Sequence, residues 1–357
     1  MSTTRSILAL RSLRVLAFLR EPKLFLAKAK IRKDRKWEEF MKPLEGKVAV
    51  VAGATRGAGR GIACALGEAG ATVYCTGRSI RGKPATGNRP ETIEETAEMV
   101  TARGGVGIYA QVDHTSADQV NALFERVKSE QKRLDILVND VWGGDELTEF
   151  GKTFWQVSLE KGRLMLERAV FSHIVTSHYA APLLIESGPG LIVEITDGDS
   201  FSYRGNIFYD LVKTSVIRLA FAMARELRKR KITSLALTPG FLRSEAMLEH
   251  FGVTEQNWED GVKKDPNFAW SETPFFVGRA VAALASDPNV FDKSGRVFSS
   301  WNLALEYGFT DVDGRRPVFF EEFEKKYKKR PRTCDETFYD YWFDSPDMIE
   351  IMFPDWP

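Results

Sequence analysis

The sequence predicts an α/β protein built on one doubly wound parallel sheet, with helices on both of its faces. From residue 46 onward, short apolar runs alternate with longer stretches of helical periodicity. The short runs are apolar throughout instead of alternating with polar residues, which is typical of strands that are covered on both faces. This repeated strand–helix order favours a single parallel sheet.

Seven runs are expected to form strands, and six stretches are expected to form helices between them. The strands are expected at 47–52, 71–75, 107–112, 134–138, 191–195, 233–237 and 296–298. The helices are expected at 58–69, 90–103, 117–131, 158–186, 209–230 and 274–286. Residues 78–90 are rich in Gly, Pro and Arg and are expected to form a long loop.

The composition limits the class of protein. Of the 357 residues, 43% are hydrophobic, which is ample for a buried core, and 28% are charged, as in ordinary globular proteins. A net charge of +1 gives no general attraction to nucleic acid. Three scattered cysteines and four histidines without ligand spacing predict neither a disulfide framework nor a metal site. We expect no transmembrane helix and a cytoplasmic location.

Two terminal extensions differ from the rest of the chain. We expect a basic extension at 1–44, one domain at 45–315 and an acidic, aromatic tail at 316–357. Residues 1–36 carry eleven Lys/Arg and two acids, whereas residues 334–357 carry seven acids and seven aromatic side chains. The basic segment has three open interpretations: a packing arm, a membrane-surface helix or a targeting peptide. We predict that at least one end packs against the domain or a neighbouring subunit.

A glycine-rich turn, Gly53-Ala54-Thr55-Arg56-Gly57-Ala58-Gly59, follows the first expected strand. Gly53 permits a tight turn, while Gly57 and Gly59 let the next helix approach a dinucleotide closely. The N-terminus of that helix offers N–H groups and a positive dipole to a pyrophosphate. The turn therefore predicts a dinucleotide site.

A second motif lies far along the chain, where Tyr209 and Lys213 are one helical turn apart. At this spacing both side chains can face the same reacting atom. Tyr209 would be the general acid for carbonyl reduction, and Lys213 would favour the phenolate electrostatically. The order of the two motifs points to hydride transfer on a nicotinamide cofactor.

Residues 51–63 resemble the cofactor turn of the short-chain dehydrogenase/reductase superfamily. The segments 137–141, 209–213 and Pro239-Gly240 fall where that family places its other motifs. The resemblance covers about 45–315, and 271–298 and 308–315 are similar to the branch that contains dehydrogenase/reductase member one. It implies one Rossmann domain with strand order 3-2-1-4-5-6-7, and a homodimer or homotetramer that packs through the helix carrying Tyr209 and the long helix before it.

Charge at the end of the second strand favours NADP over NAD. An NAD-selective site has an acid there, whereas this chain has Gly77 followed by Arg78. Arg56 and Arg78 offer guanidinium groups to a 2′-phosphate. Asp113 resembles the family's adenine contact, with a helix N-cap as the alternative. The expected cofactor-binding residues are Gly53, Thr55, Arg56, Gly57, Ala58, Gly59, Arg78, Asp113, Asn139, Tyr209, Lys213, Pro239, Gly240 and Ser244.

The catalytic motif departs from the family pattern at two positions. Where the family has Ser before the Tyr, this chain has Thr196 and Asp197, and either can take the Ser role. An ionised Asp197 cannot donate to a carbonyl oxygen, so we predict that it lies beside Tyr209 and is protonated in the productive complex. Ala169 aligns with the family's Asn, which puts the family's water relay in doubt.

An aromatic region at 241–272 is expected to form a lid over the substrate, with ordinary helix packing as the alternative. Trp142, Phe241 and Met247 are the expected pocket residues. The sequence thus predicts an NADP(H)-dependent oxidoreductase that interconverts a carbonyl and an alcohol on an apolar small molecule. The alternatives are a non-catalytic NADP-binding protein and a membrane-surface reductase of lipidic substrates, held there through residues 1–36.

Overall fold

The computed structural model describes residues 42–83, 87 and 89–339. Within these ranges, seven strands form one parallel sheet in the order β3-β2-β1-β4-β5-β6-β7, so the predicted doubly wound sheet is confirmed. The strands are β1 (Val48–Ala52), β2 (Thr72–Gly77), β3 (Val106–Gln111), β4 (Ile136–Asn139), β5 (Leu191–Ile195), β6 (Thr233–Thr238) and β7 (Val297–Ser299). Each expected apolar run is a strand, within two residues at either end.

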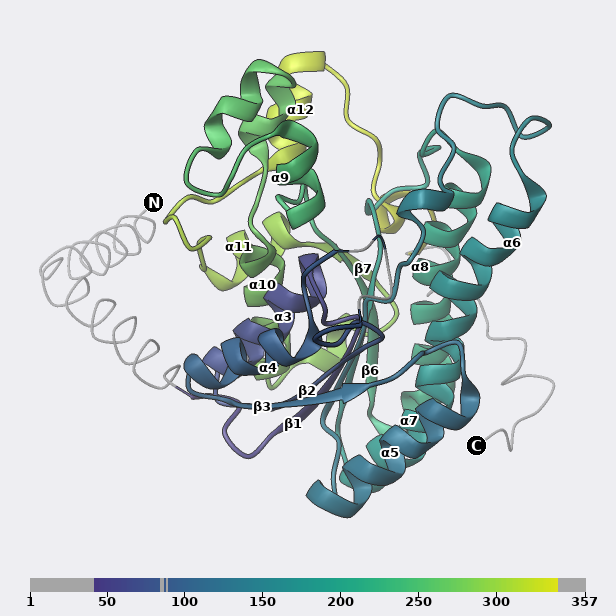
Figure 1. Cartoon of the computed structure of the whole chain (residues 1–357), viewed down its shortest axis with the longest axis vertical. Helices are drawn as coiled ribbons and strands as arrows, with labels where there is room; N and C mark the ends of the chain where they lie inside the picture. The colour runs from purple at the N-terminus through teal and green to yellow at the C-terminus, as the bar shows by residue number, and fades with distance from the viewer. Residues whose placement is uncertain (1–41, 84–86, 88, 340–357) are drawn as a thin grey trace, which may run out of the picture. The chain divides into compact units, whose positions relative to one another are not determined.

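Helices cover both faces of the sheet (Figure 1). One face carries α3 (Gly57–Glu68), α4 (Ile93–Ala102), α10 (Pro274–Ser286) and α11 (Ser300–Tyr307). The other face carries α5 (Ala117–Gln131), α7 (Ser172–Ser187) and α8 (Ile207–Leu227). The apolar side chains of the strands point alternately into these two layers, which is why their runs are apolar throughout.

Small residues let two helices of the first layer touch through their backbones. A Cβ placed on Gly61 of α3 would lie 2.0 Å from the carbonyl oxygen of Pro274, the first residue of α10. A Cβ on Gly278 would lie 2.4 Å from the carbonyl oxygen of Gly61. This contact holds the helix after the glycine turn firmly against the body of the domain.

The helix expected at 158–186 is divided in the structure. It consists of α6 (Leu159–Leu166), a π-helical turn at Glu167–Phe171, and α7. Single π-helical turns often occur at functional sites. The expected helix at 209–230 begins earlier, at Ile207, because Asn206 caps it by accepting the N–H groups of Phe208 and Tyr209.

Two further helices, α9 (Glu245–Phe251) and α12 (Phe319–Tyr327), were not predicted. Beyond α12, Cys334 is buried, and its N–H donates to the carbonyl oxygen of Asp199. Asp335 pairs with Arg296 at 3.1 Å. This part of the tail thus packs against the domain, as predicted for at least one end. Residues 1–36 and 340–357 lie outside the described residues, and within the described ranges no helix is long and apolar enough to cross a membrane.

Candidate active site

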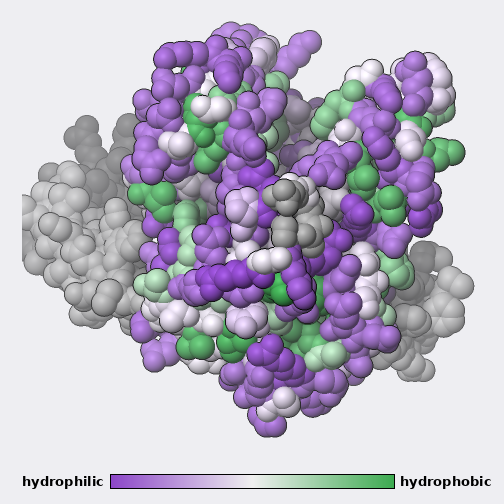
Figure 2. Space-filling view, in the orientation of Figure 1, coloured by the Kyte–Doolittle hydropathy of each residue, from purple (hydrophilic) through white to green (hydrophobic). Residues whose placement is uncertain are grey.

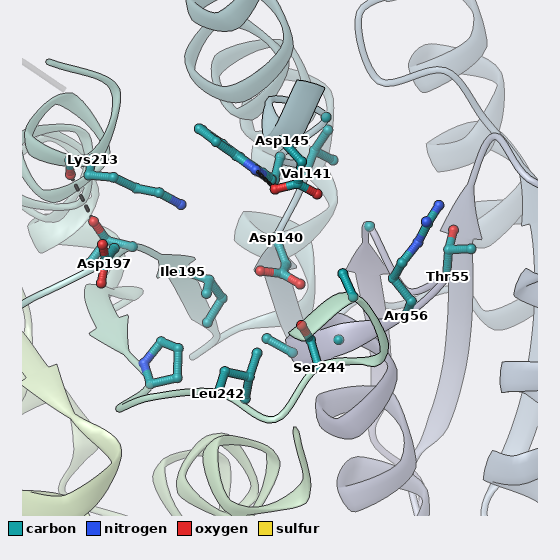
Figure 3. A pocket seen from close by; sticks show the side chains of 18 of the residues that line it. Thr55, Arg56, Asp140, Val141, Asp145, Ile195, Asp197, Lys213, Leu242 and Ser244 are labelled. Carbon is teal, nitrogen blue, oxygen red and sulfur yellow. Dashed lines mark hydrogen bonds between the residues drawn. The ribbon is translucent and has the colours of Figure 1, made fainter. Parts of the chain in front are cut away.

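A cavity of about 730 Å³ lies over the carboxyl ends of the central strands (Figure 3). Its floor includes Gly53 after β1, Asp140 after β4 and Thr196 after β5. The order of strands in the sheet reverses between β1 and β4, which is where parallel sheets of this kind bind ligands. In Figure 3, Lys213 and Asp197 lie at one end of the cavity, Asp140 near its middle, and Thr55 and Arg56 at the other end.

The structure brings most of the predicted site residues together. Those that line the cavity are Gly53, Thr55, Arg56, Gly57, Ala58, Arg78, Asp113, Trp142, Thr196, Asp197, Tyr209, Lys213, Pro239, Gly240, Phe241, Ser244 and Met247. Gly59 and Asn139 do not line it. Gly59 lies against the turn itself, since a Cβ there would be 2.3 Å from the carbonyl oxygen of Gly53.

Asn139 belongs instead to a buried polar network beneath the cavity. Its side-chain N–H groups donate to Ser177 Oγ at 2.9 Å and to Glu194 Oε1 at 2.7 Å. The other carboxylate oxygen of Glu194 lies 2.6 Å from Nδ1 of His173, whose Nε2 is 3.0 Å from the carbonyl oxygen of Val141. This network holds the backbone that leads into Trp142. The sequence analysis missed it, although a glutamate within an apolar strand was an available signal.

At the catalytic end, the hydroxyl of Tyr209 donates to Asp197 Oδ2 at 2.7 Å. The Tyr209 ring lies between two aromatic rings, with centroid distances of 5.3 Å to Trp142 and 5.6 Å to Phe150. Burial, and then the carboxylate of Asp197, raises the pKa of Tyr209 above its usual value. Tyr209 and Asp197 therefore lie side by side, as predicted. In this arrangement the phenol proton is directed at the Asp197 carboxylate.

Lys213 projects its ammonium group into the cavity. Its Nζ lies 4.4 Å from the centroid of the Trp142 ring and 5.7 Å from that of Tyr209. Burial lowers the pKa of Lys213, while the nearby carboxylates of Asp197 and Asp140 oppose the shift. Within the part of the chain that the structure describes, this ammonium makes no hydrogen bond or ion pair, so its donors are available to a ligand.

The structure distinguishes the two candidates for the family's Ser position. The hydroxyl of Thr196 donates to the backbone carbonyl of Lys213 at 2.8 Å, whereas Asp197 contacts the Tyr209 hydroxyl. Arg204 supports Asp197 from behind, because its Nε donates to the Asp197 carbonyl oxygen at 2.6 Å. Ala169 lies in the π-helical turn and packs in the apolar cluster beside Tyr209, so no amide stands at this position.

The opposite end of the cavity is lined with arginines. Arg56 lies 3.8 Å from Glu91, and Arg78 lies 3.8 Å from Asp113. The lack of an acid at Gly77 has a steric reason, since a Cβ there would be 2.6 Å from Thr55 Oγ1.

Asp113 does not cap α5. Ser116 is the N-cap and accepts the N–H of Gln119, so the N-cap alternative for Asp113 is wrong. The carboxylate of Asp113 instead accepts from the backbone and hydroxyl of Thr115. Arg168, which the sequence analysis missed, also lines the cavity and donates to the carbonyl oxygen of Gly143 at 3.1 Å.

A carboxylate from the lid reaches the glycine turn. Oε2 of Glu245, the first residue of α9, accepts the N–H of Gly57 at 2.8 Å. The N-cap residue of α3, Arg56, makes no side-chain cap of its own. Glu245 therefore caps α3 at the end that faces the cavity and ties the lid to the turn.

Part of the aromatic region at 241–272, the expected lid, packs as a unit, and part of it lines the cavity. Phe251 and Phe268 are buried against each other at 4.3 Å, and Phe241 packs on Phe268 at 5.3 Å. Phe241 also lines the cavity, together with Met247. The packing interpretation is thus confirmed for Phe251 and Phe268, while a lid over the substrate stays a prediction.

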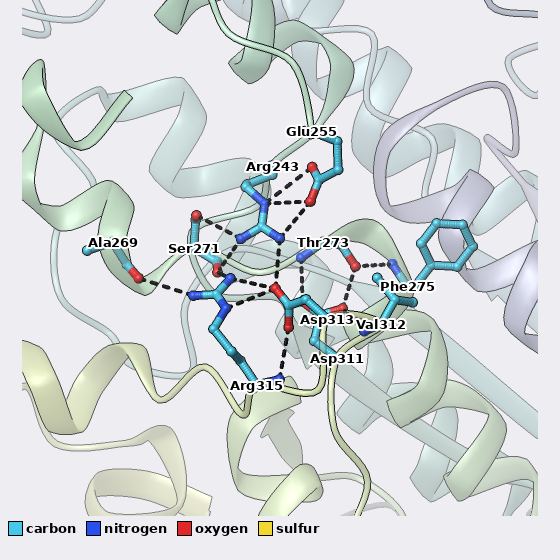
Figure 4. A network of polar contacts seen from close by, with 10 residues as sticks. All are labelled: Arg243, Glu255, Ala269, Ser271, Thr273, Phe275, Asp311, Val312, Asp313 and Arg315. Atoms are coloured by element: carbon cyan, nitrogen blue, oxygen red, sulfur yellow. Dashed lines mark hydrogen bonds and ion pairs between the residues drawn. The ribbon is translucent and has the colours of Figure 1, made fainter. Parts of the chain in front are cut away.

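A polar network fastens the lid to the segment at 311–315. Arg243 is fully buried and pairs with Glu255 at 2.7 Å and Asp313 at 3.4 Å (Figure 4). The ring of Trp258 lies 4.3 Å from the guanidinium groups of both Arg243 and Arg315. Past this segment, Phe319 and Phe320 of α12 complete the wall of the cavity, a contribution that the sequence analysis missed.

A doubly wound parallel sheet with a glycine turn, a Tyr–Lys pair and a cavity at its switch point defines an oxidoreductase of the Rossmann type. Residues 53–292 match the family described as enoyl-(acyl carrier protein) reductase. The chain is 37% identical over 278 residues to dehydrogenase/reductase SDR family member 1 of Mus musculus and of Homo sapiens, covering 76% of this chain and 85% of each relative. The protein belongs to the short-chain dehydrogenase/reductase superfamily.

Solved structures share the fold. Hydroxysteroid dehydrogenase from Escherichia coli has a TM-score of 0.60 at 23% identity, covering 74% of this chain and 98% of that one. L-sorbose reductase from Gluconobacter frateurii, complexed with NADPH and L-sorbose, has a TM-score of 0.60 at 19% identity, covering 78% and 98%. Members of the superfamily are oxidoreductases that use a nicotinamide cofactor. This general function applies to the present chain.

Proposed function

We propose that the protein is an NADP(H)-dependent oxidoreductase that interconverts a carbonyl and an alcohol on an apolar small molecule. The observation that carries the proposal is the meeting of Tyr209 and Lys213 in the same cavity as the glycine turn at Gly53–Gly59. Phe241, Phe319 and Phe320 give the substrate end an apolar wall, which suits an apolar ligand.

The residues present fit a dinucleotide. The N-terminus of α3 would hold the pyrophosphate once the Glu245 carboxylate releases the N–H of Gly57, and the unpaired ammonium of Lys213 would bind the hydroxyls of the nicotinamide ribose. Arg56 and Arg78 would bind a 2′-phosphate, which supports NADP over NAD. A member of the same fold, L-sorbose reductase, is complexed with NADPH. When bound, the nicotinamide supplies or accepts the hydride.

The chain's own residues would handle the proton. Tyr209 would donate its phenol proton to the carbonyl oxygen during reduction and accept it back during oxidation. An ionised Asp197 would hold that proton away from the substrate, because the Tyr209 hydroxyl already donates to it at 2.7 Å. Asp197 must therefore be neutralised before the transfer, and a proton on its carboxyl group would do this.

An oligomer is part of the proposal. Large apolar side chains are exposed on α6, on α7 and around them, including Phe154, Trp155, Leu159, Phe171 and Ile174. Apolar atoms appear on this side of the molecule in Figure 2. Exposed apolar surface of this kind marks contacts between proteins. We infer a homodimer or homotetramer that buries it, which sedimentation equilibrium would test.

The function is tested with a panel of ketones, aldehydes and the corresponding alcohols. NADPH oxidation in the presence of at least one carbonyl compound, with the alcohol identified as the product, is the expected result. NADPH should bind at least about tenfold tighter than NADH, which corresponds to about 1.4 kcal/mol. Tight NADPH binding without turnover of any compound would favour the non-catalytic alternative.

A further inference from the structure

We propose that the substrate carries a positive charge, as an ammonium or quaternary ammonium group, close to its reacting carbonyl. The proposal rests on the proposed function, because it names the substrate class of the same cavity. Three observations support it. Carboxyl groups lie near the catalytic end, and aromatic rings line the cavity there. A negative charge on Asp197 would also oppose proton transfer from Tyr209.

The carboxylates near the catalytic end come from two segments, one after β4 and one after β5. Asp197 follows β5, Asp140 follows β4, and Asp145 lies five residues beyond Asp140. All three act electrostatically on Lys213, and Asp145, which lies between the two ends of the cavity, also acts on Tyr209 and on Arg56. Burial raises the pKa of Asp140 to about 7, and the carboxyl group in contact with the Tyr209 hydroxyl is that of Asp197, whose Oδ2 accepts from it at 2.7 Å.

The arginines that line the cavity lie at the glycine turn and beside the segment of Trp142 and Asp145. Arg56 is at the glycine turn, and Arg78 and Arg168 flank Gly143, since a Cβ there would lie within 3.7 Å of both side chains. Arg204 lies behind Asp197 and donates to backbone carbonyls there. The ammonium of Lys213 lies beside the rings of Trp142 and Tyr209, and the proposed cofactor ribose would occupy its donors.

Aromatic rings enclose the same space. Trp142, Phe150 and Tyr209 lie on one side of the cavity, and Phe241, Phe319 and Phe320 also line it. A cation is attracted to the face of such rings. The cavity itself provides an example, because the Lys213 ammonium lies 4.4 Å from the centroid of the Trp142 ring. Aromatic faces beside carboxylates form a site that favours an organic cation over a neutral group of the same shape.

A cationic substrate would also offset the negative charge of Asp197, which hinders proton transfer from Tyr209. The Asp197 carboxylate holds the Tyr209 proton and disfavours phenolate formation. A substrate cation beside this carboxylate would offset its charge without any change in protonation. Tyr209 would then be released to the carbonyl oxygen. A neutral substrate offers no such compensation and depends on a proton at Asp197.

The test compares two ketones of the same shape that differ in charge next to the carbonyl group, (trimethylammonio)acetone and its neutral carbon isostere 4,4-dimethylpentan-2-one. Binding to the enzyme–NADPH complex is followed by tryptophan fluorescence, and turnover by NADPH oxidation. We expect the cationic ketone to bind about tenfold tighter and to be turned over with a correspondingly higher kcat/KM. Asp145→Asn should reduce this preference several-fold, whereas Asp118→Asn, an exposed position on α5 outside the cavity, should leave it unchanged.

The outcomes separate this inference from the proposed function. Turnover of both ketones without a preference for the cation would overturn the inference and leave the oxidoreductase function standing. Tighter binding of the cation without turnover of either ketone would support the charge preference and count against the reaction. Equal binding of the two, including no detectable binding of either, would overturn the inference.

Discussion

Replacing Arg78 with alanine should weaken NADPH binding while hardly affecting NADH. The Arg78 side chain lines the cavity just after β2 and is 31% exposed, with Asp113 at 3.8 Å. Hydrogen bonds to charged groups contribute roughly 1.5–3 kcal/mol. Partial exposure places the loss near the lower limit, because solvent screens the pair. The expected weakening for NADPH is therefore on the order of tenfold.

The two dissociation constants are measured by fluorescence titration of the reduced cofactors. Arg81→Ala is the matched control, since Arg81 is exposed, pairs with Glu98 and does not line the cavity. An unchanged affinity for NADPH in the Arg78 variant would refute the assignment of this guanidinium to the 2′-phosphate. An equal loss for NADH would also refute it, because NADH has no phosphate there.

Three further predictions follow from single side chains. Asp197→Ser should remain active on neutral carbonyls in the NADPH oxidation assay, because a serine hydroxyl can donate to the carbonyl oxygen and does not hold the Tyr209 proton as a carboxylate does; an inactive variant would contradict this role. Burial raises the pKa of Glu272 to about 8 from 4.5, so the folded state keeps a proton that the unfolded chain has lost. Stability should therefore fall as pH rises across that interval, and Glu272→Gln should flatten the decline in a series of thermal unfolding curves; parallel curves for the two proteins would count against it. Gly61→Ala should lower the free energy of unfolding by about 1–3 kcal/mol in urea titration, since the new Cβ would lie 2.0 Å from the carbonyl oxygen of Pro274.

The strands could be predicted because each is encoded in a local apolar run, whereas their order in the sheet followed from the family resemblance. Each strand of a doubly wound sheet is covered on both faces, so it appears as a continuous apolar run such as 47–52. Helix ends were less predictable. No residue type in the sequence indicates the π-helical turn at Glu167–Phe171, since this turn contains neither Gly nor Pro. α12 falls in a segment that was treated as part of an acidic tail.

The parts of the site that depend on short spacings along the chain were predictable. The glycine turn and the pair of Tyr209 and Lys213 are of this kind. Contacts between distant segments were not predictable. The capping of Gly57 by Glu245 joins residues 188 positions apart, and Phe319 enters the cavity from beyond the predicted domain boundary. The geometry also distinguishes Thr196 from Asp197, because the hydroxyl of Thr196 is directed to a backbone carbonyl.

The most direct measurement of the central claim is the single-turnover rate of NADPH oxidation by the Tyr209→Phe variant, with a carbonyl substrate from the panel. The account predicts that the NADPH dissociation constant stays within about twofold of that of the unaltered enzyme, because the phenol hydroxyl does not hold the dinucleotide. The oxidation rate should fall by roughly 10²–10⁴-fold, the contribution expected of a general acid. A rate within about tenfold of the unaltered enzyme would contradict the role of Tyr209 as the proton donor.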